Sequence, residues 1–327
     1  MSASKIVFLS IFLALAISLV LPFRPQTKDT SIQPSQEKPS VSTGVRAASQ
    51  NDAVTLFITA TDKKGQPAID LTKANIHVFE DATEQAVDSF QYDTSTAVFL
   101  GVLIDISGSS RDEKGREKKL SALSDFLHTG LRNQDAGFII AFRDEGFLLT
   151  DLTNSRQDFD QALSKIERYQ PHGSTSLYDS IYAAADADFH GRSGRRALLI
   201  LSDFEDNSSR YSHDKTIQKT LESGTAVFSL VDGMSYEAHQ SRRFAKRGRR
   251  VAEEISTQTG GEAFVFDSAK TLTEALEQVK SDLQNFYVIR YRPTNATHDG
   301  KFRKIKVEIP GKDLKVLTRR GYYAPKD

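Results

Sequence analysis

The feature that most constrains the fold is the alternation of apolar and helical segments between residues 97 and 285. Short apolar runs with strand character recur along this stretch, and each is followed by a segment with helical patterning. The predicted strands are Val98–Ile104, Gly137–Phe142, Phe147–Thr150, Ala197–Leu201, Thr225–Val231 and Ala263–Phe266. Such βα alternation favours a mostly parallel sheet that is covered by helices on both faces.

Helices are predicted between these strands. They are expected at Glu117–Leu127, Arg156–Glu167, Leu177–Phe189, Lys215–Glu222, Phe244–Gln258 and Leu272–Leu283. The second and third strands are separated only by a short "RDEG" turn, which indicates a hairpin and therefore one antiparallel strand. The expected fold class is α/β, with a Rossmann-like, doubly wound, mostly parallel six-stranded sheet.

The segments on either side of this region have β patterning. Val54–Asp93 and Phe286–Arg319 both contain stretches in which apolar and polar residues alternate with a period of two. A piece of about 40 residues is too small for an independent core. We therefore expect residues 53–93 and 286–327 to form one small β domain together, with the α/β domain at residues 94–285 between them.

The N-terminus indicates export. Lys5 precedes an uncharged apolar run, Ile6–Leu21, as in a secretory signal peptide. Counted with Pro22 and Phe23 the run has 18 residues, which is near the lower limit for crossing a bilayer. Residues 1–23 are therefore predicted to be a signal peptide or a membrane anchor, and the product periplasmic, membrane-anchored or secreted. Residues 24–52 are rich in Pro, Ser, Thr and Gln and are predicted to be a flexible linker.

Charge and cysteine content exclude several classes of protein. The 327-residue chain has 43 Lys and Arg against 43 Asp and Glu, so its net charge gives no reason to expect bulk nucleic-acid binding. It has no Cys, which excludes a disulfide framework, a thiolate metal site and a cysteine nucleophile.

A cluster of oxygen-bearing side chains follows the first predicted α/β strand. The apolar run ends in Asp105-Ile-Ser107-Gly-Ser109, and Asp203 follows the fourth strand. If the strand order is 3-2-1-4-5-6, these two strands are neighbours at the point where the order reverses, which is where ligands bind in open α/β sheets. The loop at 171–180 can add Ser174 and Thr175.

These residue types suit a hard divalent cation. Carboxylates and hydroxyls are ligands for Mg²⁺, Mn²⁺ or Ca²⁺ rather than for Zn²⁺ or copper. Two carboxylates balance the charge of one such ion, and the neutral hydroxyls leave it able to attract one further oxygen. The sequence therefore predicts a cation site, with Mg²⁺ as the first choice and Mn²⁺ or Ca²⁺ as alternatives.

The same motifs resemble a known family. Asp-x-Ser-x-Ser at 105–109, a Thr in the Gly-Ser-Thr loop at 173–175 and an Asp at 203 are similar to the metal-ion-dependent adhesion site of von Willebrand factor A domains. The resemblance implies that hydroxyls come from Ser107, Ser109 and Thr175, and that Asp105 and Asp203 bind the ion directly or through water. Phe204 is a departure, since A domains usually carry Gly there, and it bears on the conformation of the loop and on access to the site.

The flanking segments resemble the VWFA-related proteins of acidobacteria. The matching pieces are "DKKGQPAIDLTKANIHVFED", "YVIRYRPTN…DGKFRKIKVEI" and "RRGYYAP". With them, the resemblance extends from about residue 53 to the end of the chain.

Simpler roles for the same residues stay open. Asp105, Ser107, Ser109 and Thr175 also suit helix N-caps, and Asp203 also suits a surface turn. Glu205 and Asp206 are either solvated turn residues or supports for the ion through water. The basic run at 242–250 is either a solvated helix face or a contact for anionic lipid or an acidic partner.

Three functions are compatible with these patterns. The leading one is an exported adhesion-type module that engages an Asp or Glu carboxylate of a partner protein through the cation. The second is a structural or assembly component of a cell-envelope complex, in which the metal only stabilises the fold. The third is a metal-dependent hydrolase, which is disfavoured because the sequence has neither a Gly-x-Ser-x-Gly elbow nor a phosphate loop. We therefore expect that the protein is not an enzyme and that it does not bind nucleic acid.

Overall fold

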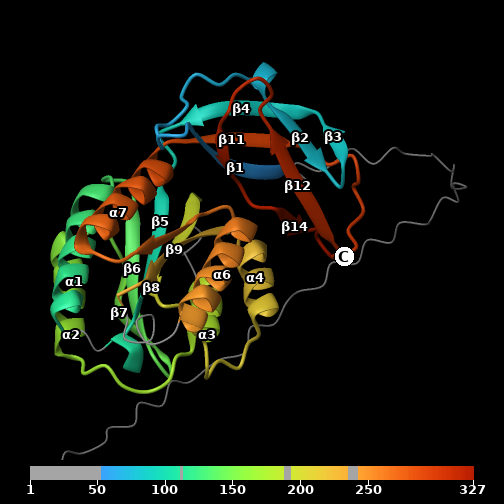
Figure 1. The fold of residues 1–327 in the computed structure, drawn as a ribbon. Coiled ribbons are helices and arrows are strands. Elements are labelled where there is room, and N and C mark those ends of the chain that lie inside the picture. Colours follow the sequence, from blue (N-terminus) through green and yellow to red (C-terminus); the bar gives the residue numbers. More distant parts are fainter. Residues whose placement is uncertain (1–52, 111–112, 188–192, 235–241) are drawn as a thin grey trace, which may run out of the picture. The chain divides into compact units, whose positions relative to one another are not determined.

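The computed structural model describes residues 53–110, 113–187, 193–234 and 242–327 (Figure 1). The predicted signal peptide or anchor at 1–23 and the predicted linker at 24–52 lie outside these residues. Within the described ranges, none of the helices combines the length and the apolar character needed to cross a membrane.

The centre of the fold is a six-stranded sheet with the order β10-β9-β8-β5-β6-β7. Its strands are β5 (Val98–Asp105), β6 (Ala136–Phe142), β7 (Gly146–Thr153), β8 (Arg195–Ser202), β9 (Thr225–Asp232) and β10 (Ala263–Phe266). All neighbours are parallel except β6 and β7, which form the predicted antiparallel hairpin. When the six strands are numbered 1 to 6 along the chain and the sheet is read from β7 to β10, the order is 3-2-1-4-5-6, so the predicted α/β fold is confirmed.

Helices cover both faces of this sheet (Figure 1). They are α1 (Glu113–Gly130), α2 (Arg156–Arg168), α3 (Leu177–Ala185), α4 (His213–Glu222), α6 (Arg242–Thr259) and α7 (Ala269–Gln284). Because alternate residues of a strand face opposite sides, Leu100 and Val102 of β5 pack with α1, α2 and α7, whereas Leu103 packs with α3 and α6. Burial of each such side chain contributes about 1.5–3 kcal/mol.

The helix boundaries follow from capping and apolar spacing. Helix α2 begins after Ser155, whose hydroxyl accepts a hydrogen bond from the backbone N–H of Asp158, and it buries Phe159 and Ile166 on one face. Helix α3 was predicted to reach residue 189, and this was wrong. The helix ends at Ala185, because Asp186 forms the C-cap and donates its N–H to the carbonyl of Tyr182.

The two flanking segments pair with each other in two further four-stranded sheets. One has the order β13-β1-β11-β4, and the other has the order β14-β12-β2-β3. The strands are β1 (Val54–Thr61), β2 (His77–Glu80), β3 (Thr83–Gln85), β4 (Val87–Asp93), β11 (Phe286–Tyr291), β12 (Phe302–Glu308), β13 (Lys315–Leu317) and β14 (Gly321–Tyr323), and a 3₁₀ turn spans Lys73–Asn75. Each sheet therefore contains strands from both ends of the described chain.

These two sheets share one core. Ile58 of β1, Val78 of β2, Ile289 of β11 and Ile305 of β12 belong to a single buried cluster. The buried carboxylate of Glu80 also links them, since its Oε2 accepts hydrogen bonds from the hydroxyls of Tyr291 (2.8 Å) and Tyr322 (2.9 Å). The two flanks therefore build these sheets together, while β3 and β14 were not predicted. That neither flank folds alone stays a prediction.

Candidate metal centre

Strands β5 and β8 bring two carboxylates together where the strand order reverses. Asp105 is the last residue of β5, and Asp203 directly follows β8. Both are buried, with 7% and 8% of their surface exposed. Ser202, the last residue of β8, donates a hydrogen bond from its hydroxyl to Asp105 Oδ2 over 2.6 Å and so ties the two strand ends together.

The turn after β5 folds its hydroxyls back over Asp105. The backbone N–H of Ser107 donates to Asp105 Oδ1 (2.9 Å), and the hydroxyl of Ser110 donates to the Asp105 carbonyl (3.1 Å). The hydroxyl oxygens of Ser107 and Ser109 lie 3.2 Å apart, and both residues are buried. This geometry gathers two hydroxyls and one carboxylate within a single turn.

The loop that carries Thr175 joins the same cluster. The N–H of Gly108 donates to the carbonyl of Gly173 (3.3 Å), which ties this loop to the serine turn. The N–H of Thr175 donates to Asn207 Oδ1 (2.7 Å), which ties it to the loop after β8. Thr175 is 5% exposed, and the N-cap of α3 is Ser176, so helix capping does not account for Thr175.

The five predicted ligand residues therefore come from three segments that hydrogen bonds hold together. Those residues are Asp105, Ser107, Ser109, Thr175 and Asp203. Of the two supporting acids, Asp206 accepts hydrogen bonds from the Ser209 hydroxyl (2.5 Å) and the Tyr178 N–H (3.4 Å), whereas Glu205 Oε2 lies 3.7 Å from Arg247 Nη1.

The electrostatics of the site are those of two buried like charges. Burial, together with the negative charge of Asp203, raises the pKa of Asp105 to about 7, against the opposing effect of hydrogen bonds from Ser107 and Ser202. Burial also raises the pKa of Asp203, against the opposing effect of hydrogen bonding by the Ser109 hydroxyl and the Glu205 N–H, and the nearby Asp232 adds to the rise. Asp203 Oδ2 is buried and has no hydrogen-bond partner.

These observations fit a hard divalent cation. A buried carboxylate oxygen without a partner is destabilising, and a cation beside it would remove both this penalty and the repulsion between Asp105 and Asp203. The remaining donors are hydroxyl oxygens, which Mg²⁺, Mn²⁺ and Ca²⁺ accept. Across the described ranges, His, Cys, Asp and Glu side chains do not form a ligand group of three or more, so hydroxyls would have to complete the shell.

Phe204 keeps the loop conformation that a glycine favours. Its φ is +61°, in the left-handed region where a bulky residue is rare. Its ring is 1% exposed in the core between the sheet and α3 and α6, and its N–H donates to the Ser202 hydroxyl over 3.0 Å. The departure from the expected glycine therefore places a buried anchor, rather than a cover, beside Asp203.

Helix α6 is packed directly against the same loop. A Cβ on Gly248 would lie 2.0 Å from the carbonyl oxygen of Asp203, a distance that no side chain tolerates. Glycine at this position is thus what allows α6 and the Asp203 backbone to approach so closely.

An ion pair next to the site was not predicted. Lys119 Nζ of α1 lies 2.6 Å from Asp232 Oδ2 at the end of β9, and both side chains are at most 9% exposed. Both residues line a small cavity together with Asp105 and Ser202. The available signal was the run "FSLVD", a third apolar strand ending in an aspartate.

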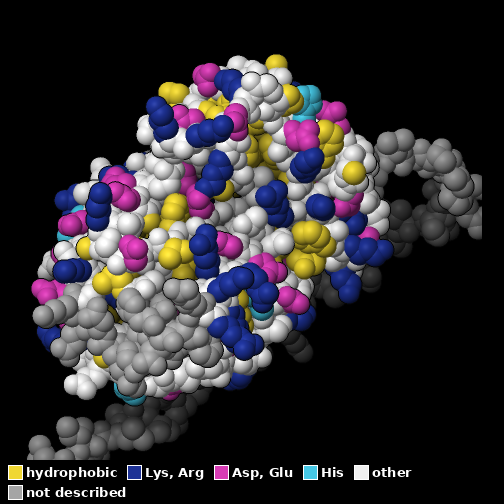
Figure 2. Space-filling model, viewed as in Figure 1, with side chains coloured by type: hydrophobic (Ala, Val, Ile, Leu, Met, Phe, Trp, Pro, Cys, Tyr) yellow, Lys and Arg dark blue, Asp and Glu magenta, His cyan; other side chains and the backbone are white. Residues whose placement is uncertain are grey.

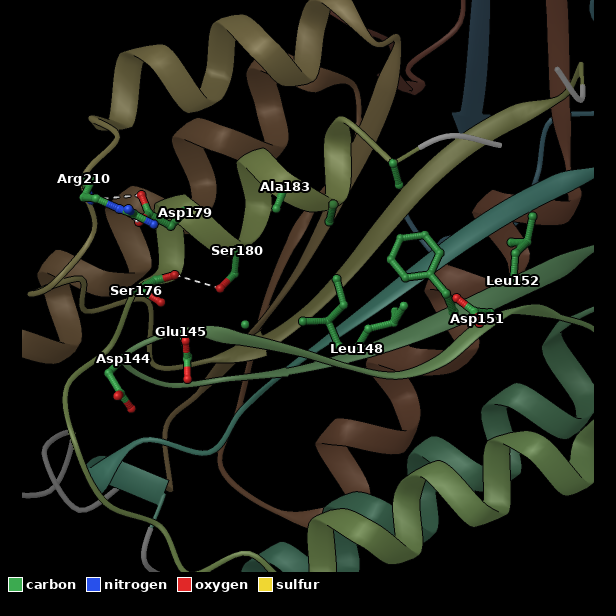
Figure 3. A pocket seen from close by; sticks show the side chains of 15 residues that line it. Asp144, Glu145, Leu148, Asp151, Leu152, Ser176, Asp179, Ser180, Ala183 and Arg210 are labelled. Carbon is green, nitrogen blue, oxygen red and sulfur yellow. Dashed lines mark hydrogen bonds and ion pairs between the residues drawn. The ribbon is translucent and has the colours of Figure 1, made fainter. Parts of the chain in front are cut away.

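A groove of about 900 Å³ begins beside the Thr175 loop (Figure 3). It runs between the β6–β7 hairpin and α3, from Ser176 at one end. Leu148 and Leu152 contribute apolar surface, while Glu145 and Asp151 contribute carboxylates. The groove therefore mixes apolar surface with charged side chains, which include the ion pair of Asp179 and Arg210.

Part of the chain matches a known domain family. Residues 100–205 match the von Willebrand factor type A domain. This match begins in β5 and ends two residues beyond Asp203, so it spans all five predicted ligand residues. No curated protein matches the chain.

Several solved structures are similar to this chain. An aerotolerance-related membrane protein from Bacteroides fragilis is 20% identical, with coverage of 56% of this chain and 98% of that one, at a TM-score of 0.43. A von Willebrand factor type A protein from Catenulispora acidiphila is 11% identical, with coverage of 86% and 76%, at 0.48. Proximal thread matrix protein 1 of the mussel byssus, with a zinc-occupied MIDAS motif, is 14% identical, with coverage of 62% and 49%, at 0.48.

Proposed function

We propose that the protein is an exported, metal-dependent binding module. Asp105, Ser107, Ser109, Thr175 and Asp203 hold one divalent cation, with Mg²⁺ as the first choice and Mn²⁺ or Ca²⁺ as alternatives. The cation supplies an open coordination position for an oxygen of an Asp or Glu side chain on a partner protein. The site binds and does not catalyse.

The observation that carries this proposal is the partnerless Oδ2 of Asp203 beside the buried Asp105 carboxylate. A protein gains nothing in stability from two buried like charges. A divalent cation between the carboxylates would relieve this repulsion, and the hydroxyls of Ser107 and Ser109 lie on the same turn to complete its shell.

The chain's own residues give the site its shape. Ser202 and the Ser107 N–H fix the two oxygens of the Asp105 carboxylate. The Asn207 side chain fixes the Thr175 loop. These bonds orient the ligand oxygens before the cation arrives, which lowers the entropy lost on binding.

Basic residues beside the site favour an acidic partner. Arg243, Lys246, Arg247 and Arg250 of α6 are all exposed and share one face through their i, i+3, i+4, i+7 spacing. Figure 2 shows Lys and Arg side chains gathered over α6. The opposite face of α6, which includes Ile255, is buried in the core and is not available for insertion into a bilayer. We propose an acidic protein segment as its occupant, because the basic face borders the proposed cation site: Arg247 Nη1 lies 3.7 Å from Glu205 Oε2.

Calorimetry tests the cation site. We expect MgCl₂ or MnCl₂ to bind wild-type protein at one ion per chain, and Asp203→Asn to abolish binding. The matched control is Asp151→Asn, an exposed carboxylate in β7, which should bind as wild type does. Absence of binding of Mg²⁺, Mn²⁺ and Ca²⁺ to wild type at millimolar concentration would refute the proposal.

A pull-down from envelope extract distinguishes binding from an assembly role. If the proposal is right, the partner that wild-type protein retains should no longer bind when chelator is added or when Ser109 is replaced by Ala. If the metal only stabilises the fold, the same partner should still bind under both conditions, provided that circular dichroism shows the immobilised protein to be folded. Metal-dependent turnover on an ester panel would instead support a hydrolase.

The basic face of α6 is tested on the retained partner. Replacing Arg243, Lys246 and Arg250 by Gln should slow association by about tenfold at low salt, because a group of positive surface charges attracts and orients an acidic partner. The control converts Lys301, Lys304 and Lys306 of the β12 region to Gln, which removes the same charge from other exposed positions. Equal effects of the two triple variants would exclude an acidic partner segment at α6.

Export is tested by N-terminal sequencing of native material. A mature start beyond residue 23 indicates a cleaved signal peptide, and an intact start in the membrane fraction indicates an anchor. An intact start in the cytoplasmic fraction would contradict export.

A further inference from the structure

Arginine side chains line a cavity at the start of β8, the end of this strand opposite Asp203. The cavity has a volume of about 80 Å³ and is lined by Arg195, Arg196 and Arg319, with Phe57 and Thr259 among its other walls. It lies between the start of β8, the end of α6 and the strands of the flanking sheets. One water molecule needs only about 10–15 Å³, so this cavity has room for a larger ligand.

Arg195 is held firmly at this cavity. It is 2% exposed, its Nη1 donates to the carbonyl of Asp282 over 2.6 Å, and its Cζ lies 4.8 Å from the ring centroid of Phe286. Its Nε is buried and has no hydrogen-bond partner. The guanidinium is thus fixed on one side and unsatisfied on another.

Arg319 approaches from the C-terminal flank. Its Nη2 donates to the carbonyl of Thr55 over 3.1 Å, and its Nε is also buried without a partner. Gly260, at the end of α6, makes this approach possible. Its φ is +93°, and a Cβ there would lie 2.5 Å from Arg319 N.

The one carboxylate that acts clearly on Arg195 within the described residues is Asp282, whose Oδ2 is itself buried without a hydrogen-bond partner. Arg195 donates to the Asp282 carbonyl rather than to this carboxylate, and Arg319 donates to the Thr55 carbonyl. Burial lowers the pKa of Arg195 to about 10 even though Asp282 acts in the opposite direction, and burial also lowers the pKa of Arg319. Asp282 Oδ1 accepts its hydrogen bond from Gln278 instead (3.0 Å). Buried charges are normally paired, since an unpaired one is strongly destabilising.

We infer that this cavity binds a small inorganic oxyanion, either phosphate or sulfate. The planar donors of a guanidinium match the spacing of oxyanion oxygens, and the unsatisfied Nε groups of Arg195 and Arg319 supply the donors. The site is separate from the proposed cation centre. Because Arg195 belongs to β8 and Arg319 to the C-terminal flank, the anion would join the α/β sheet to the flanking sheets.

Calorimetry of the full chain with sodium sulfate and with sodium phosphate, in gluconate buffer, tests this inference. We expect one site per chain for at least one of the two anions. Arg319→Gln should weaken binding by at least about tenfold, the equivalent of about 1.4 kcal/mol. The matched control is Arg290→Gln, an exposed arginine of β11, which should bind like wild type.

Two further results decide the outcome. Crystals of wild type grown in selenate should show an anomalous peak between Arg195 and Arg319, and this measurement needs no variant to fold. No binding of either anion at 50 mM, on the order of a hundredfold above a submillimolar Kd, would overturn the inference. So would equal binding by Arg319→Gln and wild type, or a selenate map without a peak in the cavity.

Discussion

Replacing Asp105 by Asn should make the metal-free protein more stable while removing its response to Mg²⁺. The substitution keeps the shape of the side chain and removes the charge that Asp203 opposes. Burial and that repulsion raise the Asp105 pKa from 3.8 to about 7, a difference of about three units. At about 1.4 kcal/mol per unit, the ionised carboxylate lowers the free energy of unfolding by about 4 kcal/mol at pH 8.

Part of this gain is lost through hydrogen bonding. Ser107 N–H and the Ser202 hydroxyl donate to different oxygens of Asp105, and an amide has only one acceptor oxygen. The lost bond costs about 1 kcal/mol. The net expectation is a gain of about 3 kcal/mol, or a rise in Tm of about 6 °C at roughly 2 °C per kcal/mol.

The pH dependence has a definite sign. Between about pH 4 and pH 7 the folded state retains a proton on Asp105 that the unfolded state has released, so the free energy of unfolding falls as the pH rises through this window. In Asp105→Asn that contribution is absent. The stability difference between variant and wild type should therefore be largest at pH 8 and small at pH 4.

Differential scanning calorimetry in chelator at pH 4, 6 and 8 measures these differences. Asp93→Asn is a matched control of opposite sign, because hydrogen bonds from Ser95 and Thr96 outweigh burial and lower the pKa of that carboxyl. It should lose stability at pH 8. If Asp105→Asn is less stable than wild type in chelator at pH 8, or if the difference does not change with pH, the reasoning about the two buried carboxylates is wrong.

Three other predictions concern the surroundings of the site and the flanking β domain. Gly248→Ala places a Cβ 2.0 Å from the Asp203 carbonyl, so we expect a loss of about 1–3 kcal/mol in urea unfolding and weaker Mg²⁺ binding; a gain in stability would contradict the close approach. Lys119→Met leaves Asp232 buried without its cation and should cost about 3–5 kcal/mol, whereas the same change at the exposed preceding lysine should cost little. Limited proteolysis should cut within 24–52 and spare the junctions near 94 and 286, and independent folding of the two flanks after separation would contradict a joint β domain.

The sequence was sufficient for the sheet because its signals are local. Each strand of the α/β region is a short apolar run, and chirality and burial leave few ways to arrange such runs with intervening helices. The reversal point then follows from the strand order, and with it the proximity of Asp105 and Asp203. The premature end of α3 was missed because Asp186 does not resemble a typical helix stop such as glycine.

The supporting residues could not be predicted in the same way. Ser202 and Lys119 act through contacts that span 97 and 113 positions, and nothing in their neighbours marks them. Glu80 is similar, since its two tyrosine partners lie more than 200 positions away. Such pairs form only in the packed fold, so the short-range alternation of apolar and polar residues in the sequence does not predict them.

The ladder of β1 gives the molecule a mechanical property. This strand pairs with β11 along its first half, from Val54 opposite Tyr291 to Ile58 opposite Tyr287, and with β13 along its second half. Its hydrogen bonds lie across the strand, so a force that pulls the preceding chain along the strand axis loads many of them at once rather than one after another. A tension applied between that chain and a partner at the α/β domain would therefore be resisted in shear, the geometry that suits a load-bearing connection.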